Sequence, residues 1–226
     1  MGRFVPVPSV KPTAFLFDWD NTLVDTFELI YTCTNAALAH VGRPTWSFEE
    51  ARRRTHLSAR DSAIDFFGDR WREAHKVYYQ TFEAEHLNTL TPFFDAADLL
   101  DVLAARGIPL GVVSNKRGSY LRAEVDKLGW TARFSAIVGA QDAPKDKPHA
   151  DPALLALRHM GLEPSRCVYM VGDTVADVGC AYAAGLTAVL QRPEAPRPGE
   201  FHPHDPHFFA QNPTSLKKLL TEIGFI

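Results

Sequence analysis

Acidic side chains follow two apolar runs of this sequence at the point where each run ends. Asp18 and Asp20 come directly after the first run, and Asp173 and Asp177 come after a later one. Short apolar runs bounded by polar or glycine residues are typical of buried parallel strands. Because ligands of open α/β sheets bind beyond the carboxyl ends of the strands, we expect the four carboxylates to meet at one edge of a sheet.

The residue types at this edge indicate phosphoryl transfer. Unpaired carboxylates repel one another, and an all-oxygen cluster without His or Cys suits a hard cation such as Mg²⁺. Ser114 and Asn115 follow a third apolar run, and Lys147 lies in a loop before another helix. Lysine is a compact charge suited to a phosphate or to a carboxylate nucleophile. Catalysis of phosphoryl transfer depends mainly on such positioning and charge stabilisation.

The elements that must position these residues alternate along the chain. The apolar runs predict strands at 13–17, 108–113, 135–138, 167–171 and 186–190. Apolar residues at helical spacing predict helices between them at 96–106, 119–128 and 152–160, and a last helix at 214–223. Alternating strands and helices predict a doubly wound, Rossmann-like α/β core with a parallel sheet. The segment 192–213 is rich in proline and histidine, which predicts an irregular surface connection.

A helical block interrupts this alternation after the first strand. Amphipathic patterns predict helices at 27–41, 48–55, 59–67 and 71–86. An insertion at this point should form a separate all-α cap domain, with hinges near 24–25 and 91–92. We therefore expect a catalytic core of residues 1–24 plus 92–226 and a cap of residues 25–91.

Four segments resemble, in order and context, the motifs of the haloacid dehalogenase superfamily: FDWDNTLVDT, VVSNK, KPHADPALL and VGDTVADVGCAYAAG. The chain is similar to the phosphoglycolate-phosphatase-like branch with a helical cap, and the resemblance spans residues 13–190. Four motifs, each after a predicted strand or before a predicted helix, are a far more specific signal than a lone DxDxT. The resemblance implies a Mg²⁺-dependent hydrolase of a small phosphomonoester.

The resemblance also implies a role for each motif residue. Asp18 would be the nucleophile that becomes phosphorylated, and Asp20 the general acid and then the general base. Lys147 would neutralise the phosphoryl charge; Lys145 is the alternative, but Pro148 after Lys147 matches the motif. The residues that would bind the phosphate are Thr22, Ser114 and Asn115. The residues that would bind the metal are Asp18, Asp20, Asp173 and Asp177. Asp20 would bind it through its backbone carbonyl, and Asp177 directly or through water.

The sequence departs from the family pattern at three places, one of which is Asp95-Ala96, where a glycine commonly opens the core helix. Asn21 replaces the usual glycine of DxDGT, and asparagine tolerates left-handed backbone better than most residues. His56 stands at a cap position that is often glycine, and we expect it and Arg60 to line a substrate-facing loop. The substrate therefore stays open among phosphoglycolate, a sugar phosphate and a nucleotide.

The same residues discriminate between other functions that this fold could have. A dehalogenase typically lacks the second aspartate and a phosphonatase usually has alanine there, so Asp20 argues against both. A phosphomutase acting on a sugar phosphate keeps both aspartates and remains an alternative. A non-catalytic regulatory protein commonly loses a nucleophile or a metal ligand, and none is missing here. Asp177 could also be only a helix cap, and we interpret His202, His204 and His207 as a solvated loop rather than a metal site.

The composition of the chain limits which partners and which cellular compartment we expect. A net charge of -3 gives no electrostatic reason to expect nucleic acid or an anionic membrane as a partner. No segment approaches the roughly 18 apolar residues of a spanning helix, and prolines interrupt every apolar run of the first residues. Cys33, Cys167 and Cys180 form no CxxC pair and read as buried side chains in a reducing compartment. We expect a cytoplasmic monomer or homodimer.

Overall fold

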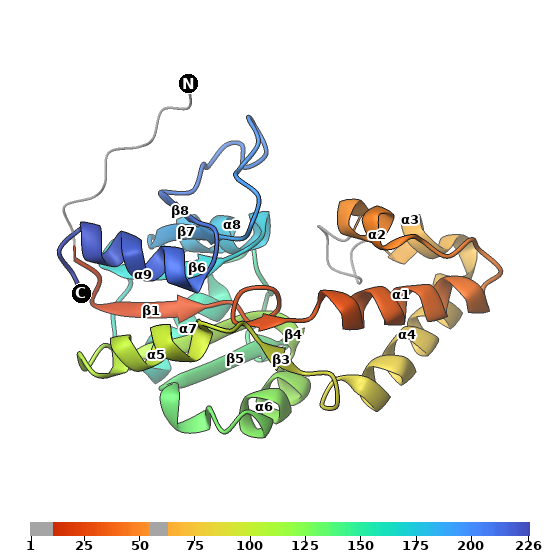
Figure 1. Cartoon of the computed structure of the whole chain (residues 1–226), viewed down its shortest axis with the longest axis horizontal. Helices are drawn as coiled ribbons and strands as arrows, with labels where there is room; N and C mark the ends of the chain where they lie inside the picture. The colour runs from red at the N-terminus through yellow and green to blue at the C-terminus, as the bar shows by residue number, and fades with distance from the viewer. Residues whose placement is uncertain (1–10, 55–62) are drawn as a thin grey trace. The chain divides into compact units, whose positions relative to one another are not determined.

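The computed structural model describes residues 11–54 and 63–226 (Figure 1). The chain divides into two compact units. The larger unit contains the chain up to Val24 and the segment Pro92–Ile226, and the smaller unit is Asp25–Thr91. The smaller unit is therefore an insertion within the larger one.

A six-stranded sheet forms the centre of the larger unit, in the order β5-β4-β1-β6-β7-β8. Neighbouring strands all run parallel, and β1 lies between β4 and β6, so that Phe15 is opposite both Leu110 and Tyr169. The carboxyl ends of these three strands consequently lie at the same edge. The strands are β1 (Ala14–Phe17), β4 (Leu110–Arg117), β5 (Ala136–Ala140), β6 (Val168–Gly172), β7 (Thr187–Gln191) and β8 (Phe208–Ala210).

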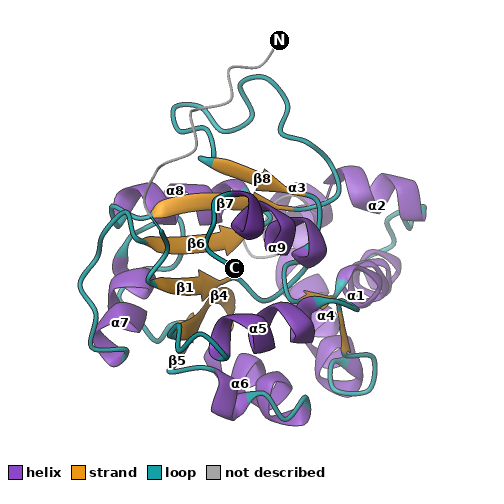
Figure 2. Cartoon of the chain, turned by 60° about the vertical axis from the view of Figure 1, so that its left-hand side comes forward, coloured by secondary structure: helices purple, strands orange, loops and turns teal. Residues whose placement is uncertain are grey.

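Helices cover both faces of the sheet. Figure 2 shows α7 (Asp151–His159) and α8 (Val175–Ala183) on one face, and α5 (Ala96–Ala104), α6 (Gly118–Lys127) and α9 (Pro213–Glu222) on the other; a short 3₁₀ helix, η2 (Thr131–Arg133), precedes β5. Ala14 and Leu16 belong to the apolar cluster under α7 and α8, while Phe15 contacts Phe225 at the end of the chain. Because successive side chains of a strand point to opposite faces, β1 is buried on both sides. This confirms the predicted α/β class.

The sequence-based prediction for residues 192–213 was wrong in one respect. We expected an irregular connection, but β8 forms within it and pairs with β7, with Phe209 opposite Leu190. Phe208 is buried and its ring stacks on Tyr169 at 5.6 Å between centroids. The strand is only three residues long and is flanked by proline and histidine, so its sequence carries no period that would reveal it.

The histidines of this segment contact aromatic and backbone groups. The rings of His204 and His207 both stack on Tyr182 of α8, at 4.3 and 4.8 Å between centroids. His207 Nδ1 also accepts a hydrogen bond from the Ala188 amide. His202 is exposed, and no metal-binding group of the described residues includes any of the three histidines.

The smaller unit is built from helices. They are α1 (Phe27–His40), α2 (Phe48–Arg54), α3 (Ala63–Phe67), the 3₁₀ helix η1 (Gly68–Arg70) and α4 (Trp71–Glu85). α1 packs along α4, and the buried residues include Cys33 and Ala37 on α1 and Tyr78 and Phe82 on α4. The strands β2 (Val24–Asp25) and β3 (Thr91–Pro92) pair with each other where the chain leaves and re-enters the larger unit. In the part of the chain that the structure describes, no helix is both long and apolar enough to span a bilayer.

We expect Leu157→Ala to lower the free energy of unfolding by about 2–5 kcal/mol, because Leu157 is fully buried in the apolar cluster of α7 and truncation would leave a cavity. Urea unfolding measures this loss. The matched control is Phe94→Ala, since Phe94 is fully exposed and its change should stay within about 0.5 kcal/mol. Equal effects of the two substitutions would contradict the packing described here.

Candidate active site

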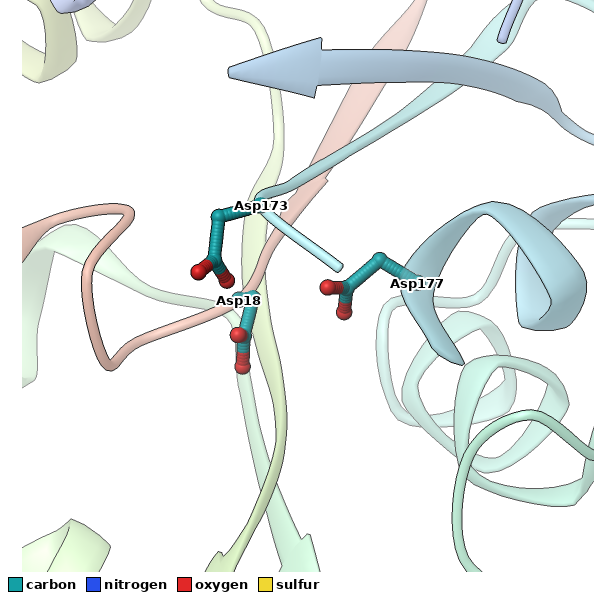
Figure 3. Close-up of side chains that lie close together, drawn as sticks. All are labelled: Asp18, Asp173 and Asp177. Carbon is teal, nitrogen blue, oxygen red and sulfur yellow. The ribbon is translucent and has the colours of Figure 1, made fainter. Parts of the chain in front are cut away.

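Three carboxylates converge at the carboxyl edge of the sheet. Asp18 follows β1, Asp173 follows the neighbouring strand β6, and Asp177 lies in the first turn of α8. One oxygen of each lies within 4.8 Å of the others, and Figure 3 shows the three carboxyl groups close together. The parallel pairing of β1 with β6 brings together two aspartates that are far apart in the sequence.

Lys147 is the cation of this cluster. Its Nζ donates hydrogen bonds to Asp18 Oδ1 at 2.7 Å, to Asp177 Oδ1 at 2.7 Å and to the Val113 carbonyl at 2.8 Å. The Lys147 side chain is 3% exposed, whereas Lys145 is exposed. Of the two lysines that the sequence left as candidates, it is Lys147 that contacts the nucleophile candidate.

Asn115 holds the main chain of Lys147 in place. The Asn115 amide donates to the Lys147 carbonyl and accepts from the Lys147 amide, both at 2.9 Å. This two-point contact joins β4 to the loop that carries Lys147. The position of the ammonium group is therefore fixed from its backbone as well as from its side-chain partners.

The electrostatics of the cluster are unbalanced. Burial raises the pKa of Asp18 from 3.8 to about 7, with Lys147 opposing the rise and Asp177 adding to it. Burial, together with the charges of Asp177 and Asp18, also raises the pKa of Asp173 well above its usual value. Burial alone would lower the pKa of Lys147. The two carboxylates that Lys147 contacts have a larger, opposite effect, so its pKa is raised and it stays charged. One ammonium among three carboxylates leaves an excess of negative charge that a cation would offset.

Asp177 has a second contact at the start of its helix. Its Oδ2 accepts hydrogen bonds from the Thr174 amide at 3.0 Å and from Thr174 Oγ1 at 2.6 Å, which completes a capping box. A Cβ on Gly172 would lie 2.2 Å from Asp177 Cγ, so the close approach of β6 to α8 requires glycine there. Asp177 is thus both a helix cap and a member of the cluster, and the two interpretations of the sequence are compatible.

The predicted phosphate-binding residues lie around the same edge. Ser114 is buried, and its Oγ accepts a hydrogen bond from the Lys116 amide at 3.2 Å. Thr22 is fully buried, and its Oγ1 has no hydrogen-bond partner among the described residues. The Thr22 carbonyl accepts a hydrogen bond from Gln191 of β7. Asn21 has a φ of 55°, the left-handed conformation that the sequence led us to expect at the usual glycine position.

The sequence profile of the haloacid dehalogenase-like hydrolases matches residues 15–190. The chain belongs to this family. Curated relatives include the phosphoglycolate phosphatase of Xylella fastidiosa, 31% identical over 189 residues and 82% of both chains. The phosphoglycolate phosphatase of Chromobacterium violaceum is 29% identical over 187 residues, covering 78% of this chain and 83% of its own. This family member is therefore an enzyme of the phosphatase type.

Solved structures of the family share the fold. A HAD-superfamily hydrolase from Ehrlichia chaffeensis matches with a TM-score of 0.67 and 27% identity, covering 95% of this chain and 98% of its own. A haloacid dehalogenase-like protein from Streptococcus pneumoniae has a TM-score of 0.80 and 24% identity, covering 92% and 98%. The matches extend over nearly the whole chain and so include the inserted helical segment.

Two predicted residues of the site, His56 and Arg60, lie outside the described residues. Three further residues at this edge were not predicted as site residues: Trp19 within the first motif, and Lys116 and Glu124, which contact that motif. Lys116 Nζ lies 2.7 Å from Asp20 Oδ1 and 2.6 Å from Glu124 Oε2, which also accepts from Trp19 Nε1. Burial lowers the pKa of Lys116, but the charges of Asp20 and Glu124 outweigh this and raise it. The sequence did contain one signal for this contact: Glu124 is an acidic residue on the apolar face of the helix that Leu121 and Val125 define.

We expect Asp18→Asn to stabilise the metal-free protein at pH 8 but not below pH 4. In the wild type, the pKa of Asp18 is raised from 3.8 to about 7, so the folded state loses stability as pH rises through this interval. One pKa unit corresponds to about 1.4 kcal/mol, so the advantage of the variant should grow to a few kcal/mol.

Urea unfolding in EDTA between pH 4 and pH 8 measures this difference. Asp126→Asn is the control, because Asp126 is exposed and distant in the sequence from the cluster; its effect should not change with pH in the same way. A stability difference between Asp18→Asn and wild type that stays constant across the interval would contradict the raised pKa of Asp18.

Proposed function

We propose that the protein is a Mg²⁺-dependent phosphomonoester hydrolase that forms an aspartyl-phosphate on Asp18, within a catalytic core of residues 1–24 plus 92–226 capped by residues 25–91. The observation that carries the proposal is the arrangement of Asp18, Asp173 and Asp177 around Lys147. A buried nucleophile, a cation and further carboxylates at the end of a parallel sheet are the components that phosphoryl transfer requires.

In the first step, Asp18 attacks the phosphorus atom. Lys147 binds Asp18 Oδ1, which leaves Oδ2 to form the new bond to phosphorus. The ester bond between phosphorus and the leaving oxygen breaks, and Asp20 donates a proton to that oxygen. In the second step, Asp20 takes a proton from a water molecule, which attacks the aspartyl-phosphate and releases inorganic phosphate.

Asp18, Asp173 and the Asp20 carbonyl would hold Mg²⁺ directly. Both Asp177 oxygens are engaged, by Lys147 and by Thr174, which favours a contact of Asp177 through water. The all-oxygen donor set suits a hard cation, and the excess negative charge of the cluster supports its binding. When bound, the ion supplies positive charge that offsets the carboxylates and the substrate phosphate.

Small polar groups complete the phosphate site. Ser114 keeps its hydroxyl proton for a ligand, because its Oγ acts as the acceptor for the Lys116 amide. The Thr22 hydroxyl has no hydrogen-bond partner among the residues that the structure describes, and it is suited to the Asp20 carboxyl or to a phosphate oxygen. Asn115 acts through Lys147 and keeps a second amide proton for the phosphate. These donors would stabilise the charge that develops on the transferred group.

The relatives support a proposal for the substrate class. Several of them are phosphoglycolate phosphatases, and we propose a small phosphorylated metabolite of this kind, with phosphoglycolate as the first compound to test. His56 and Arg60 would select the leaving group, and the protein would act in the cytoplasm as a monomer or homodimer. Release of inorganic phosphate distinguishes this activity from a phosphomutase, which retains the phosphate on a sugar.

We expect Asp18→Asn to lower phosphate release at least about 10³-fold, because the amide cannot form the covalent intermediate. Chelation of metal by EDTA should silence the wild type, and added Mg²⁺ should restore it. Release of phosphate from a metabolite panel measures both effects, with Asp126→Asn as the active control. Wild-type rates for Asp18→Asn would exclude covalent catalysis at this residue.

We expect His56→Gly and Arg60→Ala to change substrate preference more than general turnover. The measurement is kcat/KM for phosphoglycolate relative to kcat/KM for 4-nitrophenyl phosphate. A role in selecting the leaving group predicts a loss of about tenfold or more in this ratio, the effect of one charged contact of about 1.4 kcal/mol. Equal losses on both esters would argue against this role.

A further inference from the structure

Asp20 has a buried lysine of its own, separate from the lysine of the Asp18 cluster. Lys116 extends from the end of β4, and its Nζ lies 2.7 Å from Asp20 Oδ1. The Lys116 side chain is 5% exposed and that of Asp20 is 25% exposed. The ion pair thus fixes the carboxylate at its buried end while part of Asp20 stays open to solvent.

Lys116 is in turn held by a buried acidic residue. Glu124 on α6 is fully buried, and its Oε2 lies 2.6 Å from Lys116 Nζ. The same oxygen accepts a hydrogen bond of 2.7 Å from Trp19 Nε1. Trp19 is fully buried and meets Trp130 edge-on, with 5.9 Å between ring centroids. Removing this carboxylate would leave a buried ammonium and a buried indole N–H without their shared acceptor.

Trp19 also fixes the backbone of Asp20. The Trp19 carbonyl accepts hydrogen bonds from the Leu23 amide at 3.0 Å and the Val24 amide at 3.1 Å. The turn that carries Asp20 is therefore closed on the residue directly before it. The backbone of Asp20, through Trp19, and its side chain, through Lys116, are both anchored to the same oxygen of Glu124.

We propose that Lys116, supported by Glu124 and Trp19, is a positioning residue that holds the Asp20 carboxyl for proton transfer to the leaving oxygen. The inference rests on the proposed function for its catalytic consequence. A short, flexible side chain such as aspartate samples several rotamers, and an acid catalyst acts only from the one that reaches the leaving oxygen. The ion pair restricts Asp20 without consuming its second oxygen.

A direct phosphate contact by Lys116 is the competing assignment. Lys116 Nζ contacts two carboxylates and its side chain is almost completely buried, which favours a structural hold on Asp20 over exchange with a substrate oxygen. Lys147, in contrast, lies against Asp18 and Asp177 within the carboxylate cluster. Each aspartate of the Asp18–Asp20 pair therefore has a separate lysine, and we assign them different tasks.

The test measures kcat/KM for Lys116→Met on phosphate esters whose leaving oxygens differ in basicity, from 4-nitrophenyl phosphate to alkyl phosphates. An activated aryl leaving group needs little protonation, whereas an alkyl oxygen needs the proton from Asp20. We expect losses of about 10- to 100-fold on alkyl phosphates and only a few-fold on 4-nitrophenyl phosphate, part of the 10²–10⁴-fold that a general acid contributes. Asp20→Asn should give the same selective pattern with larger losses.

A double variant separates positioning from charge balance. Lys116→Met alone leaves Glu124 buried without its cation, whereas Lys116→Met with Glu124→Gln removes both charges and should recover stability in urea. The alkyl-specific loss should persist in the double variant. Recovery of alkyl phosphate turnover there would overturn the proposal, because Lys116 would then serve only to neutralise Glu124. Lys127→Met, which removes an exposed lysine at the end of α6, should behave as wild type.

Two further outcomes would also overturn the proposal. A uniform loss across the ester series with weaker inhibition by inorganic phosphate would make Lys116 a phosphate ligand. A crystal structure of the double variant that shows Asp20 ordered in its wild-type rotamer would show that Lys116 does not hold it. The structural readout does not depend on activity. A wild type that releases no phosphate from any ester would therefore refute the proposed function, while the Asp20 rotamer would still decide the role of Lys116.

Discussion

The site is organised by the burial of one ammonium group among carboxylates. Lys147 Nζ contacts Asp18, Asp177 and the Val113 carbonyl, and these partners lie directly after β1, in α8 and in β4. A buried charge is tolerated only when it is paired and hydrogen-bonded, so the three elements must meet at this atom. Burial, with a smaller contribution from the charge of Asp177, keeps the pKa of Asp18 raised, and the excess of carboxylates over lysine makes the site suited to a cation.

The strand β4 connects this cluster with the second aspartate of the first motif. Three successive residues at its end contact different partners. The Ser114 hydroxyl accepts a hydrogen bond from the backbone, Asn115 binds the main chain of Lys147, and Lys116 forms an ion pair with Asp20. Because successive side chains of a strand point to opposite faces of the sheet, neighbouring residues can contact groups on both sides of its edge. A displacement of β4 would therefore disturb both aspartates together.

The sequence predicted the α/β class and five of the six strands of the sheet, because buried parallel strands are continuous apolar runs. It did not predict β8, which is held by Tyr169 and β7 rather than by a pattern of its own. The sequence predicted that Asp18, Asp173 and Lys147 lie close together, from their positions beside predicted strands and from the order of the motifs, and the structure places them in one cluster. Lys116 and Glu124 were missed because their pairing is a contact between β4 and α6, and such contacts leave only an indirect signal in the sequence.

The pairing of β2 with β3 holds the two ends of the inserted helical unit side by side. The inserted helical unit begins and ends at adjacent backbone positions, at Val24–Asp25 and Thr91–Pro92. The entropic cost of closing a loop grows only slowly with its length, so these two ends accept insertions of very different size. The junction is therefore a natural graft point, where a foreign module can be exchanged for the resident one while the sheet and its register are retained.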